Sequence, residues 1–167
     1  MLCCGMRDDI SIRRLALEDV PHLRELNALF ATVFDDRATY SGRPPDDPYL
    51  RRLLAMDHVV VLVAVTEGRL VGGLVAYALD KFEQARREYY VYDLAVDAGF
   101  RRRGCATALL NELRRIAADA GGWVVFVQAD HGDEPAIALY ESLGTREEVL
   151  HFDLPVSARD GKADEAG

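Results

Sequence analysis

The sequence predicts an α/β fold, in which helices flank a mixed and mostly antiparallel sheet in the order βααβββαβαβ. Three observations support this prediction. Short apolar runs rich in β-branched residues alternate along the chain with segments of helical period. Two of these runs, 59–66 and 70–79, are joined by the turn Glu67-Gly68-Arg69, as in a hairpin. Residues 106–120 have a helical period, with an apolar stripe of Leu109, Leu110, Leu113, Ile116, Ala117 and Ala120.

The first half of the chain begins with an expected strand over 10–15. Helical spacing over 20–33 follows, with Asp19 as a candidate N-cap. We expect a loop over 35–47, which holds two prolines, and then a short helix through Met56. Asp47-Pro48 suits the start of that helix because Asp is a good N-cap and Pro is favoured at the first helical position.

The second half supplies most of the expected sheet. Strands are predicted over 59–66, 70–79 and 88–96, the last after a charged loop at 80–87. The helix over 106–120 ends at Gly121-Gly122, because glycine adopts the conformation that terminates helices. A strand over 123–129, a helix over 135–143 stopped by Gly144 and an alternating strand over 146–154 complete the order. We therefore expect an N-terminal extension at 1–9, one domain over 10–154 and a flexible tail at 155–167.

Composition limits the classes of protein and partner. The residues are 50% hydrophobic and 29% charged, which is typical of one globular domain. A chain of 167 residues is too short for a TIM barrel. The 20 Lys and Arg against 28 Asp and Glu give a net charge of -8, the opposite of a binder of nucleic-acid phosphates. The longest apolar run, 59–65, is too short to span a bilayer. We expect no nucleic acid or membrane partner, and an acidic surface favours either plain solubility or a cationic partner.

Cysteine and histidine usage predicts a reducing compartment and no metal. Cys3, Cys4 and Cys105 form neither a disulfide framework nor a metal-binding pattern, so the cytoplasm is the expected location. Acylation of Cys3 and Cys4 is an alternative use of those two thiols. The four histidines show no spacing typical of metal ligands.

The most informative segment is 92–107, where an apolar strand leads through a basic loop into an amphipathic helix. Gly104 and Ala106 leave backbone amides open at the positive end of the helix dipole, an arrangement that binds anions. The arginines at 101–103 add positive charge in an otherwise acidic protein. The alternative is a glycine that merely tightens the turn beside solvated arginines. Neither a P-loop nor a dinucleotide fingerprint is present.

Two motifs resemble those of the GNAT superfamily of acetyl-CoA-dependent N-acetyltransferases. Arg101-x-x-Gly104-x-Ala106, after Leu94-Ala95-Val96, resembles its pyrophosphate-binding motif, and residues 133–144 resemble its N-x-x-A-x-x-L-Y-x-x-x-G segment. The resemblance covers about 10–154. The sequence departs from the pattern at Asp133 in place of Asn, at Ala106 in place of the second Gly and at Thr145 in place of Phe.

A narrower resemblance is to the aminoglycoside 3-N-acetyltransferases of type I, which give resistance to gentamicin-like antibiotics. It rests on Tyr40-Ser41, Asp47-x-Tyr49-Leu50, Phe82-Glu83, Tyr90 to Val96, Val127 to Asp130 and Arg146 to Asp153. These residues imply transfer of an acetyl group from acetyl-CoA to the 3-amino group of such a drug.

The resemblance also implies how acetyl-CoA is bound. The third and fourth main strands of such enzymes splay apart, and the pantetheine arm enters the gap like an extra strand. Backbone groups of Leu94 and Val96 would bind it, and amides of residues 102–107 would receive the pyrophosphate. The implied cofactor-binding residues are Leu94, Ala95, Val96, Arg101, Arg102, Arg103, Gly104, Cys105, Ala106, Thr107, Asp133, Ala136 and Tyr140.

In such enzymes the amine attacks the thioester directly, and a backbone N–H near 94–96 stabilises the oxyanion that forms. Tyr140 is the candidate acid for the leaving thiolate, because a phenol with a pKa near ~10 can donate to a thiol with a pKa near ~8.5. The alternative for Tyr140 is packing of its ring on the sheet. A covalent route through Cys105 is weakly supported, since no obvious base adjoins it.

The base is left open between Asp93, Glu83 and a water molecule. Asp93 lies among apolar and aromatic residues, where an ionised carboxylate needs a cation, either the substrate ammonium or one of the arginines. Glu83 lies on the loop before this strand and is otherwise a solvated charge. Asp130 and Asp153 lie at expected strand ends, where they either contact the substrate or are ordinary surface residues. The candidate substrate contacts are therefore Glu83, Asp93, Asp130 and Asp153.

Other functions and assemblies also remain open at this point. One alternative is an acetyltransferase of another polyamine, a protein N-terminus or a lysine, and another is a non-catalytic acyl-CoA-binding regulator. Since one clear strand follows Gly144, the sheet either ends there or is completed by a partner chain in a homodimer. Residues 128–167 hold ten acidic residues against three basic ones, which would suit a polycationic acceptor.

Overall fold

The computed structural model describes residues 9–156. They fall into two compact units, one that ends at Asp133 and one that begins at Glu134, and each is described by itself. Residues 1–8 and 157–167, with Cys3, Cys4 and most of the expected C-terminal tail, lie outside the described residues.

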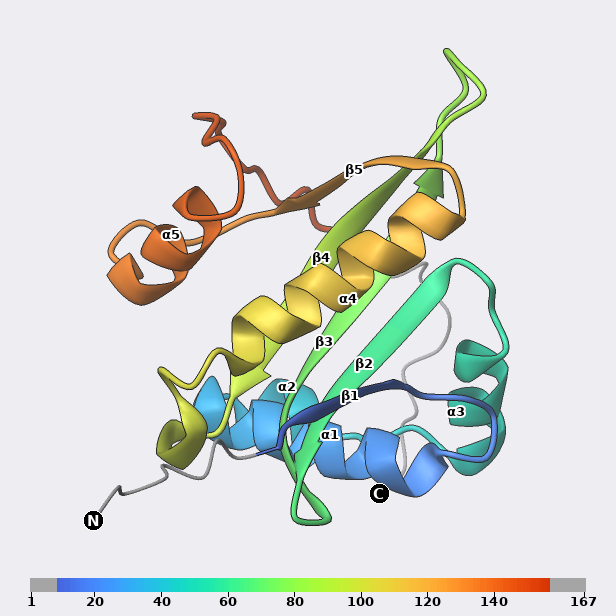
Figure 1. Ribbon diagram of the computed structural model, residues 1–167. Helices are drawn as coiled ribbons and strands as arrows, with labels where there is room; N and C mark the ends of the chain where they lie inside the picture. The colour runs from blue at the N-terminus through green and yellow to red at the C-terminus, as the bar shows by residue number, and fades with distance from the viewer. Residues whose placement is uncertain (1–8, 157–167) are drawn as a thin grey trace, which may run out of the picture. The chain divides into compact units, whose positions relative to one another are not determined.

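A five-stranded sheet forms the centre of the first unit (Figure 1). Its strands lie in chain order as β1 (Ser11–Arg14), β2 (Val59–Thr66), β3 (Arg69–Asp80), β4 (Arg87–Val96) and β5 (Gly122–Val127). The first four pair antiparallel, and β4 pairs with β5 in parallel. A parallel pair needs a crossover connection, which helix α4 provides. The predicted mixed, mostly antiparallel sheet is confirmed.

One face of the sheet is covered by α1 (Val20–Val33) and α3 (Asp47–Leu54). Apolar residues at helical spacing on α1, including Leu23, Leu26 and Phe30, pack on β2 and β3. Gly73 on β3 permits this close approach, because a β-carbon there would collide with Leu26 and with the Leu62 carbonyl. The helix therefore lies tight against the strand.

The opposite face is covered by α4 (Cys105–Asp119), which crosses in front of the sheet in Figure 1. Four residues of the predicted stripe, Leu109, Leu110, Leu113 and Ala117, are buried, whereas Ile116 is half-buried and Ala120 is exposed. The apolar period thus correctly predicted both the helix and its buried face.

Two expectations about helix caps need correction. Asp19 does not cap α1 with its side chain, because its carboxylate accepts instead from Arg13 and from the Ala16 amide. The side-chain cap of α3 is Asp46, which accepts from the Tyr49 amide, so the helix begins one residue earlier than predicted.

The expected loop at 35–47 contains a further short helix, α2 (Arg37–Ser41). The Asp36 carboxylate caps it by accepting from the Thr39 amide at 3.0 Å. Asp is a favoured N-cap residue, which was the one available sign of a helix start here. The helix was hidden because α2 is too short to show a helical period.

The second unit contains α5 (Glu134–Glu141), as predicted, but no final strand in its described part. Residues 145–156 form neither helix nor strand, although their polar and apolar residues alternate. Most of their apolar side chains are exposed, including Leu150, Phe152 and Leu154. The prediction of a strand over 146–154 is therefore wrong, because alternation favours a strand only where a neighbouring strand pairs with it.

No helix among the described residues is long and apolar enough to cross a lipid bilayer.

Candidate functional site

A β-bulge in β4 determines which way Asp93 faces. Val75 pairs with Asp93, but the next residue of β3, Ala76, pairs with Val91, so Tyr92 is the extra residue. Strict alternation would put Asp93 on the same face as Tyr89 and Val91, toward α4. The bulge places it instead on the face of Val75, toward α1.

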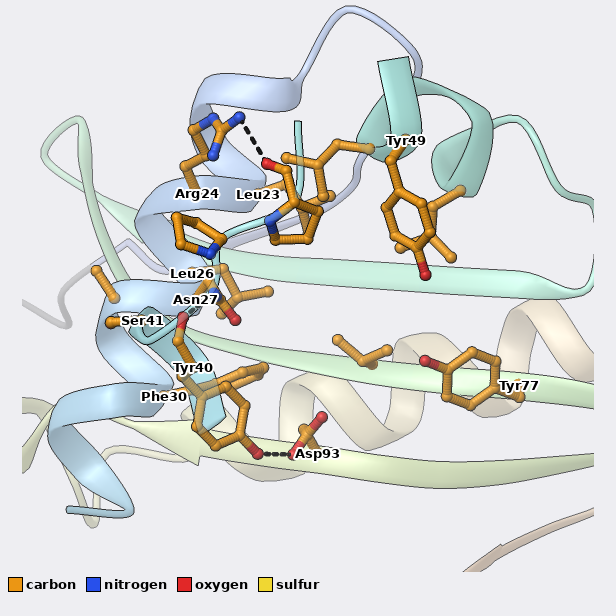
Figure 2. Close-up of a pocket in the computed structure, with 16 residues that line it drawn as sticks. Leu23, Arg24, Leu26, Asn27, Phe30, Tyr40, Ser41, Tyr49, Tyr77 and Asp93 are labelled. Carbon is orange, nitrogen blue, oxygen red and sulfur yellow. Dashed lines mark hydrogen bonds between the residues drawn. The ribbon is translucent and has the colours of Figure 1, made fainter. Parts of the chain in front are cut away.

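A pocket of about 350 Å³ opens on this face. Its walls are apolar side chains of α1 and α3, the prolines before α3, and tyrosines from three different elements (Figure 2). The two charged groups that line it are Arg24 and Asp93. The Arg24 guanidinium is bound by the Asp47 carboxylate at 2.6 Å and by the Pro45 carbonyl at 3.0 Å. Asp93 is therefore the anionic group that faces the pocket.

The Asp93 carboxyl is half-buried, and burial raises its pKa above the ordinary value. The Tyr40 hydroxyl donates a hydrogen bond to Asp93 Oδ1 at 2.5 Å, and this bond lowers the Asp93 pKa. Within residues 9–156, no lysine or arginine forms an ion pair with Asp93, so a salt bridge to Arg101–Arg103 does not account for its charge. A carboxylate of raised pKa beside an apolar pocket is suited to accept a proton.

Tyr40 reaches Asp93 from α2. Its ring contacts Phe30 at a centroid distance of 5.8 Å and Phe34 at 5.6 Å, and the Asn27 side chain donates to its carbonyl. Figure 2 shows the Tyr40 hydroxyl and the Asp93 carboxylate pointing toward one another and joined by their hydrogen bond. Sequence reasoning quoted Tyr40 in a motif but gave it no role.

The predicted anion site lies where β4 leads into α4. Arg102 and Gly104 have left-handed backbone conformations, with φ of 64° and 81°, and α4 begins at Cys105. The first amides of an α-helix have no partner within the helix, so those of residues 105–107 remain available to an anion. Binding of an anion at this turn stays a prediction.

The three arginines differ in their surroundings. Arg101 Nε donates to the Val96 carbonyl at 3.3 Å, which ties the loop to the end of β4. The guanidinium of Arg103 lies over the Phe100 ring at 5.1 Å. All three arginine side chains are exposed, as a site for a charged ligand requires.

The end of β4 has an unpaired edge. Its ladder with β5 ends at the pair Val91–Val127, whereas the ladder with β3 continues to Val96. The Asp97 amide donates to the Val71 carbonyl across β3. Because strand residues alternate, the amides of Leu94 and Val96 point to the opposite edge, where β5 no longer pairs.

Glu83, the second candidate base, does not line the pocket. It is exposed on the β3–β4 loop, where its carboxylate lies 2.9 Å from Arg86 and 3.8 Å from Lys81. A hydrogen bond from its own amide, with the nearby Lys81 and Arg86 charges, lowers its pKa. The loop joins β4 at Arg87, and Asp93 lies six residues farther along that strand, a distance of roughly 20 Å. Glu83 is therefore far from Asp93.

Cys105 does not have the properties of a nucleophile. Its thiol is buried between α4 and Gly72, and burial raises its pKa to about 11. Burial disfavours the thiolate, which is the form that a nucleophilic cysteine needs. The structure gives no support to the covalent route.

The remaining predicted residues lie on the β5–α5 loop and in the second unit. Asp130 and Asp133 are exposed on the loop, and the Asp133 amide donates to the Asp130 carbonyl. Ala136 and Tyr140 lie four residues apart on α5, and hence on one face of that helix. Asp153 is not at a strand end, because no strand forms there, and its exposed carboxylate lies 3.1 Å from His151 Nε2. Within 9–156, no three His, Cys, Asp or Glu residues form a group that could hold a metal ion.

The sequence pattern of the Acetyltransferase (GNAT) family matches residues 24–145, which include every pocket residue except Leu23, the β4–α4 turn and all of α5. The chain belongs to the GNAT acetyltransferase family. This match confirms the predicted fold class as that of a GNAT acetyltransferase. Members of this family use acetyl-CoA.

Several proteins are similar to this GNAT acetyltransferase over most of its length. A crystal structure of an aminoglycoside acetyltransferase from an uncultured soil metagenomic sample is 50% identical, with a TM-score of 0.88, over 89% of this chain and 99% of that one. A second such enzyme, in complex with sisomicin, is 33% identical, with a TM-score of 0.82, over 89% and 97%. The uncharacterized N-acetyltransferase YhfO of Bacillus subtilis (strain 168) is 27% identical over 90% of this chain and 100% of its own.

Proposed function

We propose that this GNAT acetyltransferase transfers the acetyl group of acetyl-CoA to the 3-amino group of gentamicin-like aminoglycosides and so confers resistance to them. The observation that carries this proposal is the position of Asp93 in the pocket. Asp93 presents a half-buried carboxylate, without a lysine or arginine partner in the described structure, to a pocket large enough for a sugar ring. A protonated amine satisfies that carboxylate electrostatically and then loses a proton to it.

The end of β4 and the start of α4 fit acetyl-CoA. The outward amides of Leu94 and Val96 can pair with the pantetheine arm as an added strand would, and the amides of 105–107 can bind the pyrophosphate. Arg101, Arg102 and Arg103 supply positive charge beside it. When bound, acetyl-CoA supplies an activated acetyl thioester.

The chain's own residues carry the proton transfers in this proposal. Asp93 accepts the proton of the acceptor ammonium, which frees the nitrogen lone pair for attack. A backbone amide of 94–96 donates to the acetyl oxygen as negative charge builds on it. Tyr140 donates its phenol proton to the departing sulfur. Asp130, Asp133, Ala136 and Asp153 are proposed to contact the two substrates from the β5–α5 loop and the second unit.

The acceptor class is supported by charge and by similarity. Two similar solved enzymes are aminoglycoside acetyltransferases, one of them with sisomicin bound. A chain with a net charge of -8 attracts a polycation. The apolar pocket walls suit a ring that carries few hydroxyl groups next to the reactive amine. The reducing cytoplasm is the proposed location, as the cysteine content indicates.

The test is acetylation of a panel of amines with the purified protein and acetyl-CoA. We expect release of free thiol with gentamicin and sisomicin, and NMR of the product should place the new amide at the 3-amino group. Expression in a susceptible bacterium should raise the inhibitory concentration of both drugs.

The other outcomes of this assay are equally informative. Acetylation at the 6′ position would refute the 3-amino assignment and leave the drug class standing. Turnover of another polyamine or of a protein amine, with none of any aminoglycoside, would refute the drug class. Binding of acetyl-CoA by calorimetry without acetylation of any amine would identify a non-catalytic regulator.

Substitution Tyr140→Phe tests the proposed acid. We expect kcat to fall by about ten- to a hundredfold or more while the KM for acetyl-CoA changes little, because the proton is needed only as the thiolate leaves. Steady-state kinetics against wild type measures both constants. An unchanged kcat would remove Tyr140 from this role.

A further inference from the structure

We propose that Tyr40 is a positioning residue for Asp93: its hydroxyl holds the carboxylate with one oxygen toward the acceptor amine and stabilises the anion. This inference rests on the proposed role of Asp93 as base and extends that role to a second element, α2. It predicts that the pH at which the enzyme begins to work is set partly by a residue that does not touch the reacting atoms.

The hydrogen bond itself divides the two carboxylate oxygens. Tyr40 donates to Asp93 Oδ1 at 2.5 Å. Among residues 9–156, Tyr40 is the hydrogen-bond partner of this carboxylate, which leaves Oδ2 for the ammonium. A hydrogen bond to one oxygen fixes the plane of the carboxylate, so the free oxygen keeps one direction relative to the pocket.

Tyr40 can act only as a donor in this pair. Burial, then the hydrogen bond to Asp93 and the charge of Asp93, raise the pKa of its phenol far above the ordinary value. The hydroxyl therefore keeps its proton throughout the pH range in which an acetyltransferase works, and that proton stays available to the carboxylate. Its bond stabilises the charged form of Asp93, against the desolvation that destabilises it.

The other titratable and charged groups around Asp93 do not duplicate this effect. Tyr77 of β3 and Tyr90 of β4 lie near it, and burial raises the pKa values of both phenols, so they carry no charge beside Asp93. The ring of Tyr92 packs edge-on against those of Tyr77 and Tyr90. Tyr49 from α3 lines the pocket, and Arg24 from α1 is bound by Asp47. Asp36, the cap of α2, adds a negative charge near Tyr40 and cannot stabilise a second carboxylate.

The surroundings of Tyr40 make its hydroxyl removable without loss of the fold. The ring packs against Phe30 and Phe34, and the main chain of α2 is held by Asn27 and by the Asp36 cap. None of these contacts uses the hydroxyl oxygen. Tyr40→Phe should therefore leave α2 in place and remove the single bond to Asp93.

The expected effect is a shift along the pH axis. In wild type, kcat/KM for the acceptor should rise with pH as Asp93 loses its proton. Without the Tyr40 bond that proton is held more tightly, so the rise should move to higher pH by about one unit. Activity should fall about tenfold below the transition and approach the wild-type kcat/KM well above it, where both enzymes are ionised.

Tyr90→Phe is the matched control. Its hydroxyl, also on a half-buried tyrosine close to Asp93, is bound by Gln128 at 2.9 Å rather than by the carboxylate. The control should keep the wild-type pH profile. A second test has the opposite sign: 3-fluorotyrosine at position 40 is a stronger donor, and it should move the rise to lower pH.

The experiment has a readout that does not depend on turnover. NMR of the full chain labelled with ¹³C-aspartate, with the Asp93 signal identified by its loss in Asp93→Asn, follows this carboxyl directly through its titration. We expect the Asp93 midpoint to rise by about one pH unit in Tyr40→Phe and to stay unchanged in Tyr90→Phe.

Two results would overturn the proposal. One is a folded Tyr40→Phe in which both the Asp93 midpoint and the pH profile are unmoved. The other is wild-type turnover by Asp93→Asn, because then there is no base to position. Failure of wild type to acetylate any aminoglycoside refutes the proposed function instead, and the NMR midpoint still decides whether Tyr40 stabilises the Asp93 anion.

Discussion

At the scale of single residues, Asp93 is distinguished by its position in the strand. Sequence reasoning identified it as a costly charge among apolar neighbours, and the structure confirms that it is half-buried. The face to which it points could not be predicted. Alternation along β4 groups it with Tyr89 and Val91, and one extra residue in the ladder reverses that assignment. A bulge depends on the partner strand, which no local sequence pattern reports.

Asp93→Asn should lower kcat for the acceptor by about 10²- to 10⁴-fold, the usual effect of losing a general base. Acetyl-CoA affinity, measured by calorimetry, should stay within about twofold. In the wild-type enzyme, burial raises the Asp93 pKa and the ionised carboxylate is the proposed base. Wild-type activity should therefore be lost as the pH falls through that raised pKa. Asp57→Asn, at an exposed carboxyl outside the pocket, is the control. Collapse of acetyl-CoA binding would indicate a structural role for Asp93 instead.

Gly104→Ala should cost about 1–2 kcal/mol of unfolding free energy, because its φ of 81° is strained for any residue with a β-carbon. It should also weaken acetyl-CoA, since it distorts the turn that presents the first amides of α4. Gly68 has a φ of 75° in the β2–β3 turn, and like Gly104 it has open space around it. Gly68→Ala should thus show the same loss in urea denaturation with unchanged cofactor affinity. Equal loss of affinity in both variants would count against the anion site.

At the scale of elements, the long periodic segments were predictable and the short ones were not. Strand β2 matches its predicted range, and α4 was identified within one residue at each end, because a long apolar pattern averages over local exceptions. Helix α2 has five residues and none is buried, so it leaves no period to detect. The segment 146–154 has the alternation of a strand but no described pairing partner, and such a partner is a property of the fold rather than of the segment.

The unpaired edge of β4 predicts a pattern of hydrogen exchange. In the free protein, the amides of Leu94 and Val96 should exchange with deuterium faster than that of Ala95, whose residue pairs with Gly73 across β3. Acetyl-CoA should slow the first two by at least about tenfold if it binds as an added strand. NMR of the backbone amides with and without acetyl-CoA measures this. Protection of Leu94 and Val96 before acetyl-CoA is added would show that the edge is already covered.

At the scale of the whole molecule, the charge of -8 has a defined distribution. The β4–α4 loop carries three exposed arginines, and the acidic excess lies elsewhere in the chain. Composition predicted a cationic partner as one of two explanations and could not choose between them, because a net charge does not state where the charges lie. The location of the arginines beside the end of β4 makes solubility an insufficient explanation for the pattern.

Salt should therefore affect turnover of highly charged and singly charged acceptors to different extents. For a drug with several amines, kcat/KM should fall by roughly two- to tenfold between low and high ionic strength, because screening removes the long-range attraction to an acidic protein. An acceptor with a single amine should lose much less under saturating acetyl-CoA. Steady-state kinetics over a sodium chloride series tests this. An equal fall for both acceptors would assign the salt dependence to something other than the charge of the drug.

The exposed position of α2 has a consequence for how the pocket can vary among related proteins. This helix buries no residue, lies in the connection between α1 and α3, and still brings Tyr40 to the pocket. Substitutions in the connection cost little folding stability, yet they alter what an incoming amine meets beside Asp93. A few substitutions at exposed residues of this connection can thus change the pocket and leave the sheet, with its bulge and its open edge, unchanged. Acceptor preference in this lineage is expected to evolve faster than the chemistry it serves.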